Sequence, residues 1–257
     1  MKIYEYGDKN KPVLLLLPEA LCPRTYTFAE FIKYTEKHFH IFAVSYDGME
    51  NDGSVFESVE KTAAEIENFI FENLGGKADV VYGSGMGGKI GTLIVSKEKV
   101  NIGHLIVSGA DLGSKSAFMA KLSVGKKRDE MYNAVHSGEF PPIVKKMLKS
   151  YDKREYAESL VKVFEPCKDR LKFITKDTVY NMLYSYAVTK VPHRLVTNTK
   201  VHAFHYKFMG DVYFETYKKM FVEPELKVFE NEFEEMLFRY PKNLAVMVRA
   251  CTGMLKK

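Results

Sequence analysis

The chain has 257 residues, of which 46% are hydrophobic and 28% are charged. This size and balance are typical of a globular protein with one substantial core, and they exclude a low-hydrophobicity disordered chain. The longest apolar run, residues 13–17, is far shorter than the roughly 20 residues that span a bilayer. Residues 1–8 show no signal-peptide pattern, so the sequence predicts a cytoplasmic protein without a membrane span.

Charge and cysteine content narrow the range of partners. The formal net charge is +5, and residues 112–192 carry most of the basic character, with 16 Lys or Arg against 9 Asp or Glu. Lysines there alternate with apolar residues at helical spacing, as on a solvated helix face, so we expect no nucleic-acid partner. Three scattered cysteines, Cys22, Cys167 and Cys251, are too few for a disulfide framework or a zinc site, and we expect no metal or cofactor.

Short apolar segments alternate with amphipathic ones through the first 111 residues. The apolar segments predict strands at 12–17, 40–45, 79–82 and 103–108. The amphipathic segments predict helices at 25–38, 58–74 and 90–95. This alternation is typical of right-handed βαβ units and of a mostly parallel sheet.

The alternation stops after residue 111. Residues 112–192 have helical spacing throughout, with turns expected at Gly125, 138–142 and 165–166. Strand patterns return at 201–208 and 226–229, and further helices are expected at 213–221 and 241–255. The sequence therefore predicts one α/β core formed by residues 1–111 and 193–257, with residues 112–192 inserted into it as an all-helical cap.

The segment 80–88, Val-Val-Tyr-Gly-Ser-Gly-Met-Gly-Gly, fits two incompatible motifs. Gly83, Gly85 and Gly88 match the G-x-G-x-x-G turn that places a pyrophosphate on a helix N-terminus. That fold needs an acid at the end of the next strand, where Ser108 stands, and its motif belongs in the first βαβ unit. In the second motif, Gly83 and Gly87 are the small flanks of a nucleophile elbow, G-x-S-x-G, and Gly85 holds the nucleophile position.

With the second motif, nearly the whole chain resembles the α/β-hydrolase superfamily, in a branch of small bacterial hydrolases with a helical cap. Five stretches carry the resemblance: residues 14–23 as a strand and oxyanion loop, 40–48 as the next strand, 83–88 as the elbow, 105–110 as the following strand, and 238–241 as the start of the last helix. The resemblance implies an α/β-hydrolase fold, which also accounts for the cap insertion and the number of strands.

The catalytic residues that the resemblance implies are missing. The family has a serine at the elbow, a His-Gly pair in the oxyanion loop and a histidine after the last strand. Here Gly85 replaces the serine, Pro18 and Glu19 replace the pair, and no histidine follows His205. The expected place of the base holds other residues: Asn231, Glu232, Phe233 and Glu234. Acyl transfer through a covalent intermediate therefore has neither its nucleophile nor its base.

Neighbouring residues are poor substitutes. Ser84 precedes the elbow position by one, and using it would place Tyr82 and Met86 at flanks that need small side chains. Cys22 is a second candidate nucleophile, although a small thiol packed under the cap explains it better.

Two acids and two histidines complete the candidates. Asp211 and Asp111 stand at the two places where the family keeps its acid. Two interpretations stay open for each of them: a remnant of a catalytic triad, or an exposed loop carboxylate. His202 and His205 are three positions apart on one predicted strand, so they point to opposite faces and are interpreted as structural.

The residues around the elbow predict a site for an anion or a ligand. The backbone N–H of Met86 and that of Glu19 or Ala20, with the helix dipole behind them, form an anion-binding nest. The Glu19 carboxylate either fills this nest, repels anions from it, or points to solvent. We expect the ligand pocket at Glu19, Ala20, Ser84, Gly85 and Met86.

Three functions follow as hypotheses. The first is a pseudo-hydrolase that has lost Ser–His chemistry and binds a small apolar or anionic molecule. The second is a hydrolase acting on an ester or other acyl substrate, in which a carboxylate of Glu232, Glu234 or Asp211 is the base. The third is an interaction module that docks through its basic cap. A homodimer is compatible with each of them.

Overall fold

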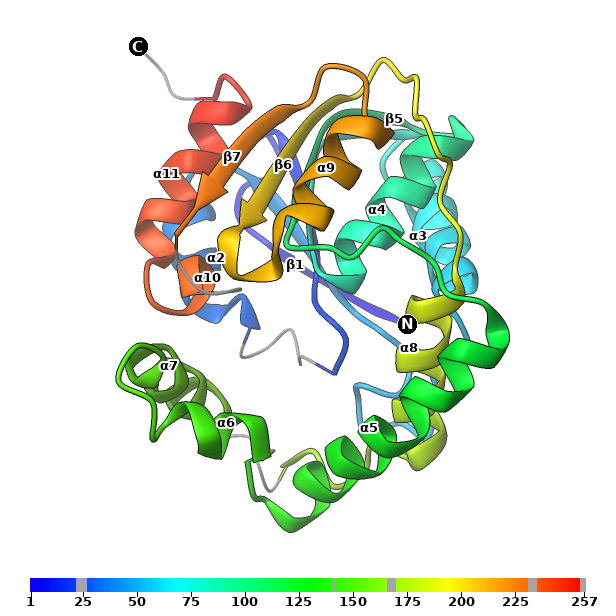
Figure 1. Cartoon of the computed structure of the whole chain (residues 1–257). Helices are drawn as coiled ribbons and strands as arrows, with labels where there is room; N and C mark the ends of the chain where they lie inside the picture. Colours follow the sequence, from blue (N-terminus) through cyan, green and yellow to red (C-terminus); the bar gives the residue numbers. More distant parts are fainter. Residues whose placement is uncertain (22–26, 141, 166–169, 231–234, 255–257) are drawn as a thin grey trace.

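The computed structural model describes residues 1–21, 27–140, 142–165, 170–230 and 235–254. Within these residues one seven-stranded sheet has the order β1-β3-β2-β4-β5-β6-β7 (Figure 1). The strands are β1 (Lys2–Tyr6), β2 (Val13–Leu17), β3 (His40–Ser45), β4 (Lys77–Ser84), β5 (Asn101–Ser108), β6 (Lys200–Tyr206) and β7 (Glu225–Phe229). All neighbours pair in parallel except β1 with β3, which confirms the predicted mostly parallel sheet.

The edge strand β1 has no counterpart among the predicted strands. It alternates exposed Lys2 and Glu5 with the half-buried residues Ile3, Tyr4 and Tyr6. Because an edge strand has a neighbour on one side only and is incompletely covered, no continuous apolar run marks it in the sequence.

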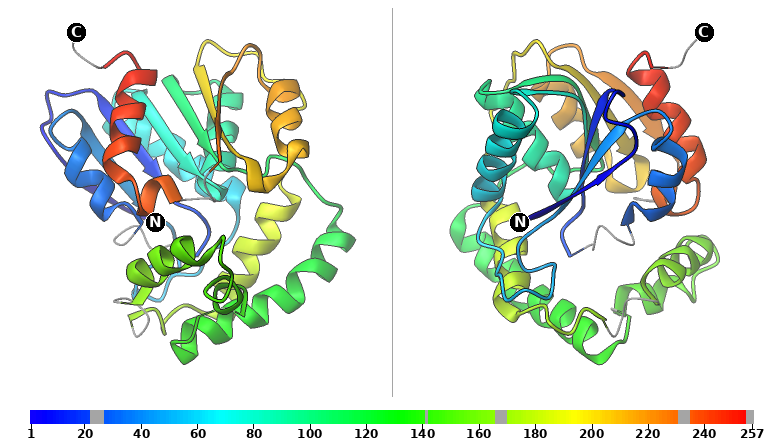
Figure 2. Two further views of the ribbon diagram at one scale, coloured as in Figure 1. Left: turned by 60° about the vertical axis from the view of Figure 1, so that its left-hand side comes forward. Right: turned by 180° about the vertical axis from the view of Figure 1, so that it is seen from behind.

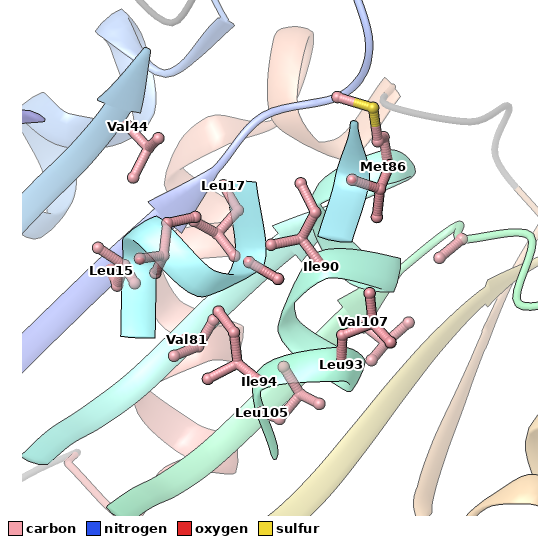
Figure 3. Close-up of a cluster of buried hydrophobic side chains, with 14 of the residues drawn as sticks. Leu15, Leu17, Val44, Val81, Met86, Ile90, Leu93, Ile94, Leu105 and Val107 are labelled. Atoms are coloured by element: carbon pink, nitrogen blue, oxygen red, sulfur yellow. The ribbon is translucent and has the colours of Figure 1, made fainter. Parts of the chain in front are cut away.

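Helices cover both faces of the sheet (Figure 2). On one face lie α3 (Val59–Asn73), α4 (Met86–Lys97) and α9 (Asp211–Met220); on the other lie α2 (Ala29–Thr35), α10 (Glu235–Phe238) and α11 (Pro241–Cys251). Figure 3 shows the packing beneath α4, where Ile90 and Ile94 lie in one buried cluster with Leu15, Val81 and Leu105 of three adjacent strands. This burial holds α4 against the middle of the sheet.

Several element boundaries differ from the prediction, including those of α4 and β6. The helix α4 begins at Met86, four residues earlier than expected, so its first turn contains Gly87 and Gly88. The strand β6 ends at Tyr206, and a 3-10 helix, η2 (Lys207–Met209), follows where the strand was expected to continue. The sequence shows the apolar content of both segments and the glycine turn after β4, but no residue pattern marks the 3-10 turn after β6.

Among the described residues, four α-helices lie between β5 and β6, and they are called the helical segment below. They are α5 (Ala117–Ser137), α6 (Pro142–Met147), α7 (Arg154–Phe164) and α8 (Lys176–Val188). The expected turn at Gly125 is wrong, because α5 runs through this residue without a break. A glycine inside a helix costs about 1 kcal/mol relative to alanine and does not by itself end the helix.

Hydrogen bonds fix α8 against the segment that leads into α3. The Asn181 side-chain amide donates to the Phe56 carbonyl at 2.8 Å, and the Val59 N–H donates to Ser185 Oγ at 3.2 Å. Figure 1 shows α5 running beside α8 and then away from it toward α6 and α7. None of the helices in the described ranges is long and apolar enough to cross a bilayer.

Candidate functional site

The turn between β4 and α4 has the geometry of a nucleophile elbow. Gly85 joins the two elements with φ +48° and ψ −111°, a conformation that side-chain-bearing residues rarely adopt. The backbones at its flanks are in close contact. A Cβ at Gly83 would overlap the Gly87 carbonyl, and one at Gly87 would overlap the Leu17 carbonyl of the neighbouring strand. Both flanking glycines are therefore required for close packing, as the second motif predicts.

The loop that faces this turn begins at the end of β2. The buried Tyr46 hydroxyl, at the end of β3, donates to the Pro18 carbonyl at 2.9 Å. This hydrogen bond anchors the first residue of the loop, and Glu19 and Ala20 follow directly. Because β2 and β4 are parallel neighbours, their carboxyl ends bring Glu19 and Gly85 to the same edge of the sheet.

The Glu19 side chain points into the turn. Its Oε1 accepts the N–H of Ala20 at 2.5 Å and the N–H of Met86 at 3.1 Å. These are the two backbone donors that the sequence predicts for an anion-binding nest. One carboxylate oxygen of the protein itself therefore takes up both donors.

The other Glu19 oxygen lies over Gly85. A Cβ built on Gly85 would overlap Glu19 Oε2, so the carboxylate occupies the volume where a side chain at the elbow would begin. Of the three orientations open from the sequence, the structure places the carboxylate inside the nest. Ser84, one residue earlier, is fully buried at the end of β4.

The Glu19 carboxyl is also electrostatically perturbed. Burial raises the pKa of Glu19 to about 7, against the opposing effects of the Ala20 and Met86 N–H groups and of the Lys127 ammonium. The group therefore exchanges its proton near neutral pH, whereas an exposed glutamate is fully ionised there.

A cavity of about 330 Å³ lies beside the neighbouring strand ends, lined by Gly109, Asp111, Tyr186, Phe208, Met209 and Tyr213. The Tyr186 hydroxyl accepts the backbone N–H of Asp111 at 2.7 Å. Burial, together with the nearby Glu19 charge, raises the pKa of Tyr186, so this phenol stays neutral. The structure thus brings Asp111 close to the elbow, on a partly buried loop after β5.

Lys89, one turn into α4, connects the elbow helix to the helical segment. Its fully buried Nζ donates to the carbonyls of Gly113 at 2.7 Å, Tyr186 at 2.8 Å and Thr189 at 3.4 Å. Burial lowers the pKa of Lys89 to about 8, while Asp111 and Glu60 oppose this shift. The three carbonyls come from the two ends of the helical segment, so Lys89 holds these ends together.

The two histidines of β6 face opposite sides of the sheet, as their spacing predicts. His205 packs against the aromatic rings of Phe214 and Tyr217 on α9. His202 lies near Glu225, with its Nδ1 2.8 Å from the carboxylate, and its Nε2 is 3.0 Å from His104 Nδ1. Both lie within the sheet, and neither is part of the turn at Gly85.

Other predicted residues fall outside this arrangement or outside the described residues. Asp211 is exposed at the first residue of α9. Cys22 and the expected place of the base, Glu232, Phe233 and Glu234, lie outside the described residues. No group of His, Cys, Asp or Glu in the described ranges is arranged to hold a metal ion.

The sequence did not predict the hydrogen bonds of three side chains that shape this edge: Tyr46, Lys89 and Tyr186. Each forms a hydrogen bond with the backbone of a segment far away in the chain. Tyr46 donates to the Pro18 carbonyl, Lys89 donates to the Gly113 carbonyl, and Tyr186 accepts the N–H of Asp111. No local motif marks such contacts. A lysine directly before the apolar predicted helix 90–95 was the one available signal, because a charged group beside a buried segment needs partners.

Comparisons with known proteins identify the fold. No protein-family model matches the sequence, and no curated protein matches it. Among solved structures, a protein assigned to the alpha/beta hydrolase family from Desulfitobacterium hafniense has a TM-score of 0.78 at 16% sequence identity, over 97% of this chain and 99% of that one. A thermophilic esterase from Thermogutta terrifontis has a TM-score of 0.73 at 14% identity, covering 97% and 91%.

An enol-lactonase from Burkholderia xenovorans LB400 is similar over 98% of this chain and 96% of its own, with a TM-score of 0.69 at 11% identity. These similarities extend over nearly the full length and agree with the elbow geometry at Gly85. The chain therefore has the α/β-hydrolase fold, as the sequence predicts. At these low sequence identities the similarity shows the fold alone. The activity of this chain has to be inferred from its own residues.

Proposed function

We propose that this protein is a pseudo-hydrolase: a small-molecule-binding protein on the α/β-hydrolase fold that does not carry out Ser–His acyl transfer. The observation behind the proposal is the position of the Glu19 carboxylate, which accepts both nest donors and fills the space above Gly85. An acyl-transfer site needs those donors free for the oxygen of the tetrahedral intermediate.

The elbow itself supports the same conclusion. Gly85 has no hydroxyl to attack an acyl carbon, and an incoming carbonyl oxygen would have to displace Glu19 Oε1 from two N–H groups. The sequence has no histidine after His205 to act as the base. We further propose that residues 112–192 form a cap above this edge and that residues 1–111 and 193–257 form the core.

A labelling and turnover experiment tests the proposal. The protein is incubated with a fluorophosphonate probe and with a panel of short and long acyl esters, beside the variants Gly85→Ala and Ser84→Ala. We expect no stoichiometric label and no turnover above either variant. Stoichiometric labelling of the wild type, or ester hydrolysis that Ser84→Ala removes, would show a working nucleophile and overturn the proposal.

The raised pKa of Glu19 favours a second candidate, a hydrolase with a carboxylate base. In this mechanism Glu19 Oε2 takes a proton from a water whose oxygen attacks the acyl carbon, and the departing alkoxide takes that proton back. Turnover would then rise with pH through about 7, where Glu19 ionises, and Glu19→Gln would abolish it. A hydrolysis rate unchanged in Glu19→Gln excludes this candidate. The acids Glu232 and Glu234 stay predictions for the same role.

A further inference from the structure

A second, larger hollow lies between the helical segment and the sheet. This cleft has a volume of about 770 Å³ and is bounded by α5, α6, α7 and η2. Its lining residues are Lys127, Ile143, Val144, Lys146, Met147, Ser150, Lys153, Tyr156, Leu160 and Phe208. Its size falls within the range of about 300–1,000 Å³ that is usual for small-molecule sites.

The charged groups of the cleft are all positive. Three lysines belong to the lining, and none of the described lining residues is acidic. Within the described part of the chain, Lys127 and Lys146 form no ion pair. Three acids near these lysines in the sequence have other partners: Asp129 pairs with Arg128 and Lys176, Glu139 pairs with Lys145, and Glu155 pairs with Arg239. Lys127 and Lys146 therefore offer positive charge that no described acidic residue neutralises by direct contact.

The rest of the lining is mostly apolar, and part of it is open to solvent. Ile143 is 61% exposed and Phe208 is 48% exposed, while Val144 and Tyr156 lie buried beneath them. Exposed apolar side chains next to Lys127 and Lys146 form a surface with two chemistries: a hydrocarbon wall and a cationic rim. A ligand that matches both has an apolar body and an anionic end.

The position of the cleft connects it to the elbow edge. Phe208 lines both this cleft and the cavity beside Asp111, and the Lys127 ammonium acts electrostatically on Glu19. Figure 1 shows the arrowheads of β6 and β7 pointing toward the side where α6 and α7 lie. A molecule in the cleft therefore lies next to the carboxyl edge of the sheet, where α/β folds usually bind ligands.

From the charge and lining of this cleft we propose that it binds an amphipathic anion: a hydrocarbon chain that ends in a single carboxylate or phosphate headgroup. The headgroup lies among Lys127, Lys146 and Lys153, and the chain lies along Ile143, Met147 and Phe208. This inference deepens the proposed function, because it names the chemical class of the small molecule.

Isothermal titration below the critical micelle concentration tests the ligand class. The probes share one chain length and differ in the headgroup: dodecanoate, dodecyl phosphate, dodecanol and dodecylamine. We expect one-to-one binding of an anionic probe, weakened by added salt, and at least about fivefold weaker binding of the alcohol and the amine. The tighter of the two anions identifies the headgroup.

Two adjacent lysines of α6 provide a matched pair of variants. Lys146 lines the cleft, whereas Lys145 lies outside the lining and pairs with Glu139. We expect Lys146→Gln to weaken binding of the anion about three- to fivefold and Lys127→Gln to act similarly, while Lys145→Gln has no effect. Ile143→Ser should weaken anion and alcohol alike, because it removes exposed hydrocarbon wall without touching the core.

Several results would overturn the proposal. Equal affinity for the alcohol or the amine, or equal effects of Lys146→Gln and Lys145→Gln, would show that the lysines do not select the ligand. Absence of saturable binding below the micelle concentration would show that the cleft takes no single amphipath. These results concern binding alone. Labelling or ester turnover concerns the proposed loss of catalysis, so the two proposals fail separately.

Discussion

Gly85 and Glu19 are individually unremarkable residues that together determine the chemistry of the elbow. Gly85 leaves a space above the turn, and the Glu19 carboxylate fills this space while accepting two backbone N–H groups. The residue identities were visible in the sequence. The orientation of Glu19 was not visible, because the Met86 N–H comes within reach of its side chain only when β2 and β4 are neighbours in the folded sheet.

This arrangement predicts a specific coupling between the two positions. Gly85→Ala should destabilise the wild type by the strain of a positive φ, about 1 to 3 kcal/mol, and further because its Cβ displaces the carboxylate. In a Glu19→Ala background the second contribution disappears. Urea unfolding of the wild type, both single variants and the double variant measures the difference, which we expect to be about 1 to 2 kcal/mol. Strictly additive effects would show that Glu19 does not occupy this space.

The titration of Glu19 predicts a pH dependence of stability. Its folded-state pKa of about 7 lies above the ordinary value of 4.5, so the folded protein binds the proton more tightly. The free energy of unfolding should therefore fall as pH rises from about 4.5 to about 7, by up to about 3 kcal/mol, and then level off. Glu19→Gln should be more stable than the wild type at pH 8 but not at pH 4.5. Urea unfolding at both pH values measures this difference.

An exposed glutamate provides the control for that measurement. Glu72 lies on the solvent side of α3. Glu72→Gln should change stability by a similar small amount at both pH values. If Glu19→Gln behaves in the same way, the carboxyl is not buried in the nest.

At the scale of elements, α4 does more than support the turn at its N-terminus. Its first turn contributes the Met86 N–H to the nest, and its second contributes Lys89 to the ends of the helical segment. One helix therefore positions both the elbow and the helices α5 and α8. The connection combines the buried Lys89 ammonium and its three carbonyl partners with a backbone hydrogen bond from the Lys115 N–H to the Ala187 carbonyl.

Removing this group should loosen the helical segment specifically. Lys89→Met leaves the Gly113, Tyr186 and Thr189 carbonyls without their donor, and we expect it to destabilise the protein by about 2 to 4 kcal/mol. Hydrogen exchange should increase at residues 113–116 and 187–190 more than in β4. Lys99→Met, at an exposed position, should change neither quantity. Unchanged exchange at both segment ends in Lys89→Met would show that they are held by other contacts.

At the scale of the whole molecule, the features assigned above to ligand binding lie at one edge of the sheet. The nest, the cavity beside Asp111 and the basic cleft are all close to the carboxyl ends of the parallel strands. The opposite end of the sheet has its own polar group, in which His104, His202 and Glu225 contact one another across three strands. Part of the positive charge of residues 112–192 lies at this cleft, because three lysines of the helical segment line it.

The sequence by itself determined the parallel sheet, the helices between β5 and β6, and the elbow at Gly85. It could do so because apolar periodicity and glycine spacing are local properties. Only the tertiary structure decided that β1 joins the sheet edge, that Glu19 fills the nest, and that lysines of α5 and α6 meet one apolar wall. These features arise between segments that are distant in the chain, and their energies depend on burial and on partners that exist only after folding.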